Sequence, residues 1–185
     1  MPARTETSDV FVLLLRGINV GGHNKLPMAT LRELLACLGA ENVATYIQSG
    51  NAVFSLGAKE VKTCENKLSA RIEKEFGFSP DLFMLDRAAY LKILKQNPYK
   101  LDEAEGKKLH VAFLTKPASK TGLDKVKEAL VDGEDITSKG KVLYFYAPNG
   151  VGRSKAAEKL NAAFSDGTMR NWRTCLKLAE MVEAL

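Results

Sequence analysis

A glycine-rich segment from Gly17 to Lys25 is the part of the sequence whose residue types most clearly indicate chemistry. Its three glycines allow left-handed backbone and close approach to a ligand. The segment separates an apolar stretch from a helical pattern, so its free N–H groups and the positive helix end could hold an anion, with Lys25 adding charge. The alternative is a sharp connection in which the glycines only satisfy backbone geometry.

The segment does not match a standard phosphate-binding motif. Gly17 and Gly22 have the outer spacing of a P-loop, but His23 and Asn24 stand where Lys and then Ser or Thr are needed. The G-x-G-x-x-G pattern of dinucleotide-binding proteins is missing as well. The loop therefore predicts an anion site without identifying the ligand.

Two further segments place cations and hydroxyl groups at predicted helix starts. In residues 168–174, Arg170 and Arg173 fall in the first turns of a predicted helix, where the helix dipole disfavours cations by roughly 0.3–1 kcal/mol. An internal carboxylate or a bound anion would offset that cost, while Trp172 shares an apolar helical face and is expected in the core. Residues 150–155 likewise combine glycines, cations and a hydroxyl group at the start of a predicted helix.

Catalytic constellations are sparse. Histidine is the residue type whose ordinary pKa lies near neutral pH, and the sequence has two histidines, His23 and His110; His110 lies in an apolar strand, where packing is the expected role. The sequence contains no nucleophile elbow and no metal-spaced cluster of His, Cys or Asp, so no catalytic residue, metal or cofactor is predicted. An enzyme of unrecognised type stays open, in which polar residues of the loop would act on a phosphate or acyl group.

The net charge of +5 is concentrated near the C-terminus. The chain has 185 residues with 27 basic and 22 acidic side chains, and the stretch Lys141–Lys177 alone holds seven cations against Glu158 and Asp166. A solvated helix surface is the simpler interpretation. The alternative is a surface for nucleic acid, whose binding would weaken steeply with salt.

The composition is that of a folded protein. Hydrophobic residues make up 45% and charged residues 26%, which excludes disordered and collagen-like chains. The apolar run Val10–Leu15 is far shorter than the roughly 20 residues of a membrane helix, and the mixed-charge start with no cleavage site does not resemble a signal peptide. Three scattered cysteines indicate a reducing compartment, so we predict a cytoplasmic protein without a membrane partner.

The first half reads as strand, helix, strand, strand, helix, strand, which predicts a ferredoxin-like α+β fold. Apolar runs and helical spacings place these elements at Val10–Leu15, Pro27–Leu38, Val43–Gln48, Asn51–Phe54, Val61–Phe76 and Leu82–Leu85. In a right-handed strand–helix–strand crossover the first two strands run parallel. The glycine-rich loop and the Gln48–Asn51 hairpin then leave the sheet at the same edge.

A smaller α+β half is predicted to follow a third helix at Arg87–Gln96 and a polar linker at Tyr99–Lys108. Its expected elements are a strand at Leu109–Leu114, a helix at Leu123–Leu130, an extended segment at 135–138, a strand at Val142–Tyr146, and two closing helices at Arg153–Phe164 and Arg170–Val182. Gly167 would end the first closing helix and Thr168 would cap the second. The predicted domains are residues 8–97 and 98–185.

The favoured function is binding of a phosphate-bearing small molecule, with backbone donors and amides from the loop and hairpin and charge from arginine and lysine. The oligomeric state is left open. The predicted ligand-binding residues are Arg16, Gly17, Asn19, Gly21, Gly22, Asn24, Lys25, Gln48, Ser49, Asn51, Arg153, Ser154, Arg170, Asn171 and Arg173.

Several of these motifs together resemble a bacterial family, domain of unknown function 1697. They are Leu15-Arg16-Gly17-Ile18-Asn19-Val20-Gly21-Gly22, Thr45-Tyr46-Ile47-Gln48-Ser49-Gly50-Asn51 and Arg170-Asn171-Trp172-Arg173-Thr174. The resemblance runs from about Val10 to Glu180. It implies a cytoplasmic bacterial protein with a ferredoxin-like N-terminal half and a smaller α+β C-terminal half, and it implies no activity. Met169 departs from the small residue that the family usually has between Thr and Arg. His23 occupies a position where the family accepts other polar residues, which argues against His23 as a catalytic base.

Overall fold

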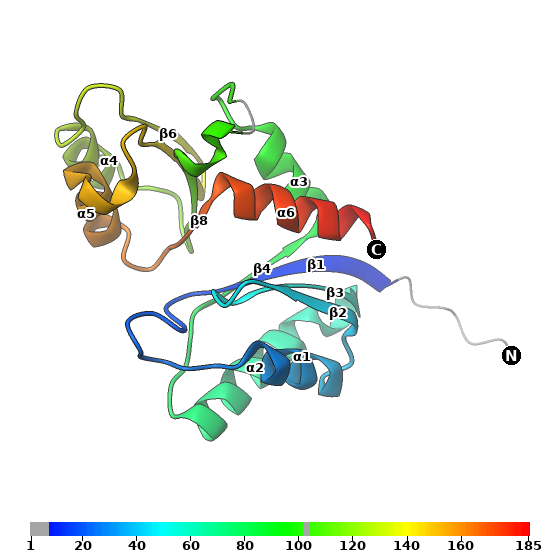
Figure 1. Cartoon of the computed structure of the whole chain (residues 1–185). Coiled ribbons are helices and arrows are strands. Elements are labelled where there is room, and N and C mark those ends of the chain that lie inside the picture. The colour runs from blue at the N-terminus through cyan, green and yellow to red at the C-terminus, as the bar shows by residue number, and fades with distance from the viewer. Residues whose placement is uncertain (1–7, 102–103) are drawn as a thin grey trace, which may run out of the picture. The chain divides into compact units, whose positions relative to one another are not determined.

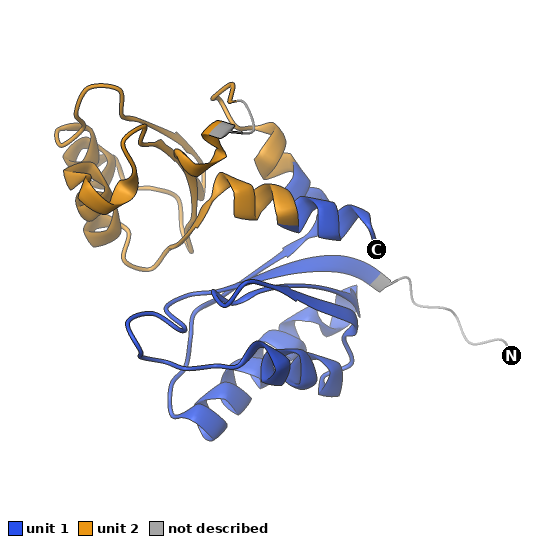
Figure 2. Cartoon of the chain, in the orientation of Figure 1, with its two compact units in different colours: residues 1–91, 178–185 blue, residues 92–177 orange. Residues whose placement is uncertain are grey.

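The protein is described by a computed structural model that covers residues 8–101 and 104–185, in which the chain forms two compact units (Figure 2). Unit 1 contains the residues up to Leu91 together with Leu178–Leu185, and unit 2 contains Lys92–Lys177. A division into folding domains at residue 97 stays a prediction.

Unit 1 is a four-stranded antiparallel sheet with two helices against one face (Figure 1). In chain order its elements are β1 (Ser8–Leu15), α1 (Met28–Cys37), β2 (Glu41–Tyr46), β3 (Asn51–Gly57), the short 3-10 helix η1 (Ala58–Glu60), α2 (Val61–Phe76) and β4 (Leu82–Asp86). The strand order β2-β3-β1-β4 confirms the ferredoxin-like prediction. Strands β1 and β2 are both antiparallel to β3, so they run parallel to each other.

The continuous apolar run of β1 is buried on both faces. Leu13 and Leu15 pack in one core cluster with the helices, while Val12 and Leu14 on the opposite face are also fully buried. The helices contribute to this cluster at helical spacing through Leu31, Leu35, Leu68 and Ile72. Each such side chain contributes roughly 1.5–3 kcal/mol on burial, so a continuous apolar run suits a strand that is buried on both faces.

Unit 2 has the same topology as unit 1. Its elements are α3 (Arg87–Lys95, shared with unit 1), η2 (Ala104–Lys107), β5 (Leu109–Phe113), α4 (Lys120–Lys127), β6 (Asp135–Lys139), β7 (Val142–Tyr146), η3 (Val151–Arg153), α5 (Lys155–Ala163), β8 (Thr168–Asn171) and α6 (Trp172–Glu183, whose last turns belong to unit 1). The strand order β6-β7-β5-β8 equals that of unit 1 when β5 to β8 are counted as strands one to four. The C-terminal half is therefore a second ferredoxin-like unit.

The predicted helix at Arg170–Val182 is wrong at its start. Residues 168–171 form the edge strand β8, which pairs with β5 so that Val111 lies opposite Arg170. The helix begins at Trp172, and the Asn171 Oδ1 atom accepts the backbone N–H of Thr174 at 2.8 Å. Asn171, rather than Thr168, caps the helix. The α6 dipole consequently disfavours the charge of Arg173 and does not act in this way on Arg170, which lies in β8.

Other boundaries shift by a few residues for local reasons. Helix α4 begins at Lys120, three residues before its predicted start, because the Ser119 Oγ atom accepts the N–H of Gly122 at 3.1 Å. The predicted linker is partly ordered onto the sheet of unit 2. The Tyr99 ring stacks on Tyr146 at 5.7 Å, and its hydroxyl donates to Asp135 at 2.9 Å.

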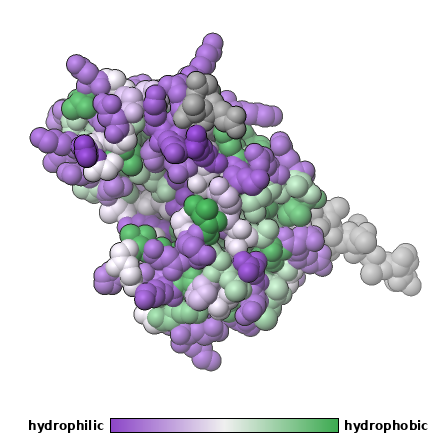
Figure 3. All heavy atoms as spheres, in the orientation of Figure 1, coloured by the Kyte–Doolittle hydropathy of each residue, from purple (hydrophilic) through white to green (hydrophobic). Residues whose placement is uncertain are grey.

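The described helices give no candidate for a membrane span, since none combines the required length with sufficient apolar character. Hydrophilic side chains predominate on the face drawn in Figure 3, with scattered apolar ones between them. Large apolar residues exposed in the described chain are Val20, Ile47, Val131, Leu176 and Leu185.

Candidate functional site

The glycine-rich loop and the β2–β3 hairpin meet at one edge of the unit 1 sheet. The Asn19 Nδ2 group donates to the Gln48 carbonyl at 2.8 Å, and the Leu15 N–H donates to the Gly50 carbonyl at 2.7 Å. Gly50 has φ 73°, and a Cβ there would lie 2.6 Å from the Leu15 Cβ. Residues thirty apart in sequence are thus in direct contact, as the crossover argument predicts.

Asn19 holds the loop together from inside. Its Nδ2 group also donates to the Leu26 carbonyl at 2.9 Å, and its Oδ1 atom accepts the Leu26 N–H at 2.9 Å. Its backbone is left-handed at φ 54°, a conformation that Asn adopts more readily than most residues. The whole Asn19 amide is therefore used within the protein.

The tip of the loop is a tight turn with left-handed backbone at both central residues. Gly21 and Gly22 have φ 58° and 81°, and the His23 N–H donates to the Val20 carbonyl at 3.0 Å. This is the pattern of a type I′ turn, which needs glycine or asparagine. Asn24, at φ 49°, closes the base of the turn by donating from Nδ2 to the Gly17 carbonyl at 2.9 Å.

The hairpin loop is fixed by a buried amide. Asn51 is fully buried, and its Nδ2 group donates to the Tyr46 carbonyl at 3.1 Å and to the Ser49 hydroxyl at 2.9 Å. Gln48 remains exposed. Ile47 is half-exposed and left-handed at φ 49°. The loop spans residues 47–50 and is therefore two residues longer than the gap between the predicted strands Val43–Gln48 and Asn51–Phe54.

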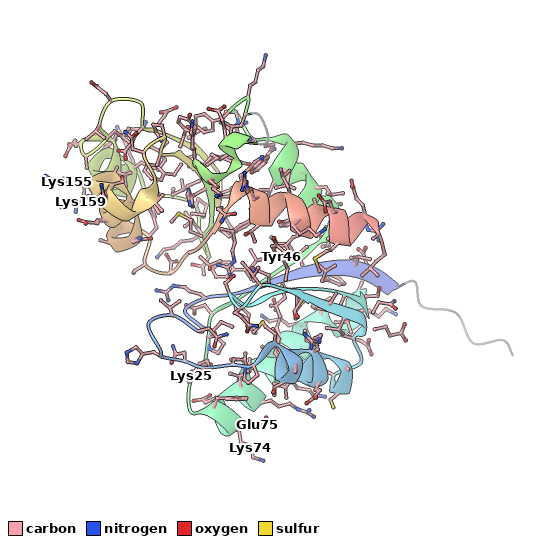
Figure 4. All side chains as sticks on the ribbon, viewed as in Figure 1. Lys25, Tyr46, Lys74, Glu75, Lys155 and Lys159 are labelled. Carbon is pink, nitrogen blue, oxygen red and sulfur yellow. The ribbon has the colours of Figure 1, made fainter. Side chains whose placement is uncertain are left out.

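Charge and backbone donors lie on the outside of this edge. The Arg16 guanidinium pairs with Asp81 at 2.9 Å, with 41% and 51% of the two side chains exposed. Lys25 is exposed and makes no ion pair with any described residue (Figure 4). Within the described chain, the N–H groups of Gly17, Gly21 and Gly22 have no hydrogen-bond acceptor. The edge thus offers free donors and a cation to solvent.

The five predicted ligand residues of the C-terminal half lie in unit 2, and several have structural roles. The Ser154 Oγ atom caps α5 by accepting the Ala157 N–H at 3.0 Å, and Asn171 caps α6. Arg170 is buried and donates to the Thr168 hydroxyl at 2.7 Å and the Met169 carbonyl at 2.9 Å. The other two, Arg153 and Arg173, are exposed.

The basic stretch Lys141–Lys177 does not come from one element. Its cations lie in the β6–β7 turn, in η3, in α5, in β8 and in α6. Lys155 and Lys159 share one side of α5 (Figure 4), whereas Arg170 is buried in β8. The excess charge is therefore distributed over several elements, and part of it is unavailable to a ligand.

Two hollows lie elsewhere in the protein, and sequence reasoning missed both. In unit 1 a hollow of about 480 Å³ is bounded by the end of α1 and by α2, with Lys59, Lys67 and Arg71 among its lining residues. In unit 2 one of about 440 Å³ is bounded by α4 and α5, with Lys125 and Lys159 in its lining. Lys67 and Arg71 are four residues apart and so lie on the same side of α2. This spacing is the sequence signal that could have indicated the hollow in unit 1.

Burial shifts the pKa values of His110 and Tyr144 in unit 2. The His110 imidazole lies in β5, where burial lowers its pKa below the usual value, and its Nδ1 atom has no hydrogen-bond partner there. For the Tyr144 hydroxyl, whose charged form is the deprotonated one, burial raises the pKa to about 12. That hydroxyl donates a hydrogen bond to the Ile93 carbonyl. No group of three His, Cys, Asp or Glu side chains among residues 8–101 and 104–185 could hold a metal ion.

The comparisons with known proteins agree with this fold. The structure is similar to that of a conserved bacterial protein from Streptococcus pneumoniae, with a TM-score of 0.74 and 25% identity over 96% of this chain and 99% of that one. No curated protein matches the sequence. The model of a protein family of unknown function, DUF1697, matches residues 9–144, which include the glycine-rich loop, the hairpin and the chain from β1 to the first three residues of β7. The chain therefore belongs to the DUF1697 family, as its glycine-loop and hairpin motifs suggest.

Proposed function

We propose that the protein binds an anionic, phosphate-bearing small molecule at the edge formed by the glycine-rich loop and the β2–β3 hairpin. The observation that carries this proposal is the length of the loop. The connection from β1 to α1 has twelve residues, 16–27, whereas the equivalent connection from β5 to α4 in unit 2 has six, 114–119. Unit 2 forms the same topology with a connection of half that length. In the unit 1 connection Ile18 and Leu26 pack into the core, so the exposed residues between them are the part that is available for a role other than packing.

The two units build this corner of the sheet in the same way apart from the loop. The Leu15 N–H bonds the Gly50 carbonyl in unit 1, and the Leu114 N–H bonds the Lys141 carbonyl in unit 2 at 2.8 Å. Arg16 pairs with Asp81 just before β4, and the Thr115 hydroxyl bonds Asp166 just before β8. The added segment in unit 1 is therefore an insertion at a corner that is otherwise complete.

The chemistry of the insertion favours an anion. Its exposed glycine N–H groups are donors without acceptors, and consecutive donors in turns of left-handed backbone form concavities that hold phosphate or carboxylate. Lys25 adds a cation with no carboxylate partner within the described chain. The exposed Arg16–Asp81 pair stabilises the fold by at most about 1 kcal/mol, so Arg16 can turn toward a ligand at low cost.

We also infer a cytoplasmic location. All three cysteines, Cys37, Cys64 and Cys175, are free thiols, which suits a reducing compartment.

The test is an amide NMR titration with inorganic phosphate and pyrophosphate. We expect the amide signals of Gly17, Gly21 and Gly22 to shift in a saturable way. Lys25→Gln should weaken pyrophosphate binding about fivefold, because one charge contact near a surface contributes about 1 kcal/mol. Lys155→Gln on α5 is the matched control and should leave affinity unchanged. Equal affinities in both variants, or no saturable shift in the loop, would contradict the proposal.

A further inference from the structure

Two exposed apolar residues are next in sequence to the residues that join the glycine-rich loop to the hairpin. Val20 is 66% exposed and Ile47 is 50% exposed, and they are two of the five large apolar residues exposed in the described chain. Each adjoins in sequence one partner of the 2.8 Å hydrogen bond from Asn19 to Gln48. Isolated exposed apolar residues are common, so exposure alone assigns them no role. Two further observations favour a role for them: both residues adjoin the Asn19–Gln48 contact, and Ile47 has an unusual backbone conformation.

Ile47 has an unfavourable backbone conformation for its residue type. The positive-φ residues other than glycine in the described chain are Asn19, Asn24, Asn42 and Ile47. Asparagine tolerates the left-handed region, whereas a β-branched side chain is a genuine outlier there. Because half of the Ile47 side chain is exposed, its packing offsets only part of the free-energy cost of the left-handed backbone. Strain retained at an exposed position is typical of binding sites.

We propose that Val20 and Ile47 contact the apolar part of the ligand held at the glycine-rich loop. This inference rests on the proposed function, and it narrows the ligand to a phosphate ester that carries an aromatic or other apolar group close to the phosphate. Backbone N–H groups of the loop would hold the anionic end. The two β-branched side chains would cover the apolar end and remove its surface from water, which favours binding. Inorganic phosphate and polyol phosphates lack that second contact.

The test compares three probes of similar charge: inorganic phosphate, glycerol 3-phosphate and phenyl phosphate, each titrated by NMR at one pH and ionic strength. We expect phenyl phosphate to bind about tenfold more tightly than glycerol 3-phosphate, a factor typical of one partly buried apolar contact. Ile47→Asn and Val20→Thr should each reduce that preference to less than about threefold and leave the affinity for glycerol 3-phosphate unchanged. Val131→Thr, at an exposed apolar position of unit 2, is the matched control.

Folding of the Ile47→Asn variant is checked separately. Asparagine suits φ 49°, so its thermal midpoint should equal or exceed that of the wild type, and a lost preference cannot then be ascribed to unfolding. Equal wild-type affinity for the two esters, or variants that keep the preference, overturns this inference and leaves the proposed function standing. Absence of saturable binding by all three probes overturns the proposed function, and this inference with it.

Discussion

Replacing Asn19 by aspartate tests whether one amide determines the shape of the glycine-rich loop. Asn19 donates from Nδ2 to the Leu26 carbonyl at 2.9 Å and to the Gln48 carbonyl at 2.8 Å. Asn19→Asp keeps the acceptor for the Leu26 N–H and tolerates the left-handed backbone, but it removes both donors. Two lost hydrogen bonds at about 1 kcal/mol each, plus two carbonyls without partners, give an expected loss of roughly 2–3 kcal/mol at neutral pH.

The loss should depend on pH in a defined direction. Two carbonyl oxygens facing a carboxylate disfavour its charged form, so the pKa of the introduced aspartate lies above its unfolded value of about 3.9. A raised pKa in the folded state means that the folded variant holds a proton more tightly than the unfolded chain does. The loss in unfolding free energy relative to wild type is therefore complete above the raised pKa. It becomes smaller as the pH falls through that pKa and is smallest below about 3.9. The protonated carboxyl can also donate one of the lost hydrogen bonds.

The assay is urea unfolding of the wild type and the variant at pH 7.5 and pH 4.5, analysed as free energies of unfolding with the slope checked for constancy. Asn19→Gly is the control, because glycine accepts the backbone conformation and cannot titrate. Its deficit relative to wild type should be the same at both pH values. An Asn19→Asp deficit below about 0.5 kcal/mol, or one that does not shrink at pH 4.5, would refute the role assigned to this amide.

Three further changes test the fold around the site. Gly50→Ala should lower the unfolding free energy by about 2 kcal/mol or more in urea titrations, because a Cβ would lie 2.6 Å from the Leu15 Cβ in left-handed backbone; an unchanged midpoint would contradict the contact. Ser154→Ala should cost about 1 kcal/mol by loss of the α5 cap, and Ser154→Asp should restore most of it. Burial lowers the pKa of His110, so wild-type stability should fall as the pH drops below about 6.5, and His110→Gln should flatten that slope.

The fold of unit 1 could be predicted because its signals are local and strong. Val10–Leu15 is a continuous apolar run, and the helices show apolar residues at regular helical spacing with Gly77 at the end of α2. The right-handed crossover then leaves few topologies, and it places the loop beside the hairpin. The resulting contact between Asn19 and Gln48 follows from topology and needs no further knowledge of the chain.

Strand β8 could not be predicted because local sequence preference and tertiary pairing disagree there. Apart from Met169, residues 168–171 are polar, and the segment is only four residues long and continuous with the helical pattern of α6. What makes them a strand is pairing with β5, together with Gly167, where a Cβ would lie 2.6 Å from the Leu114 Cδ2 atom. An edge strand of this kind is set by the rest of the sheet, and a short polar sequence carries little of that information.

The candidate site is predicted from residue types. A residue type does not indicate whether its polar groups bond the protein itself or remain available to a ligand. The amides of Asn19, Asn24 and Asn51 bond the protein's own carbonyls, so these side chains shape the loop and hairpin. Loss of ligand binding after their substitution would report a changed shape and could not by itself assign them a contact. Lys25 and the exposed glycine N–H groups present chemistry outward, and the Lys25 substitution removes charge without removing an internal bond. A loop fixed by internal amides pays little ordering entropy on binding, so even a few backbone donors can select an anion.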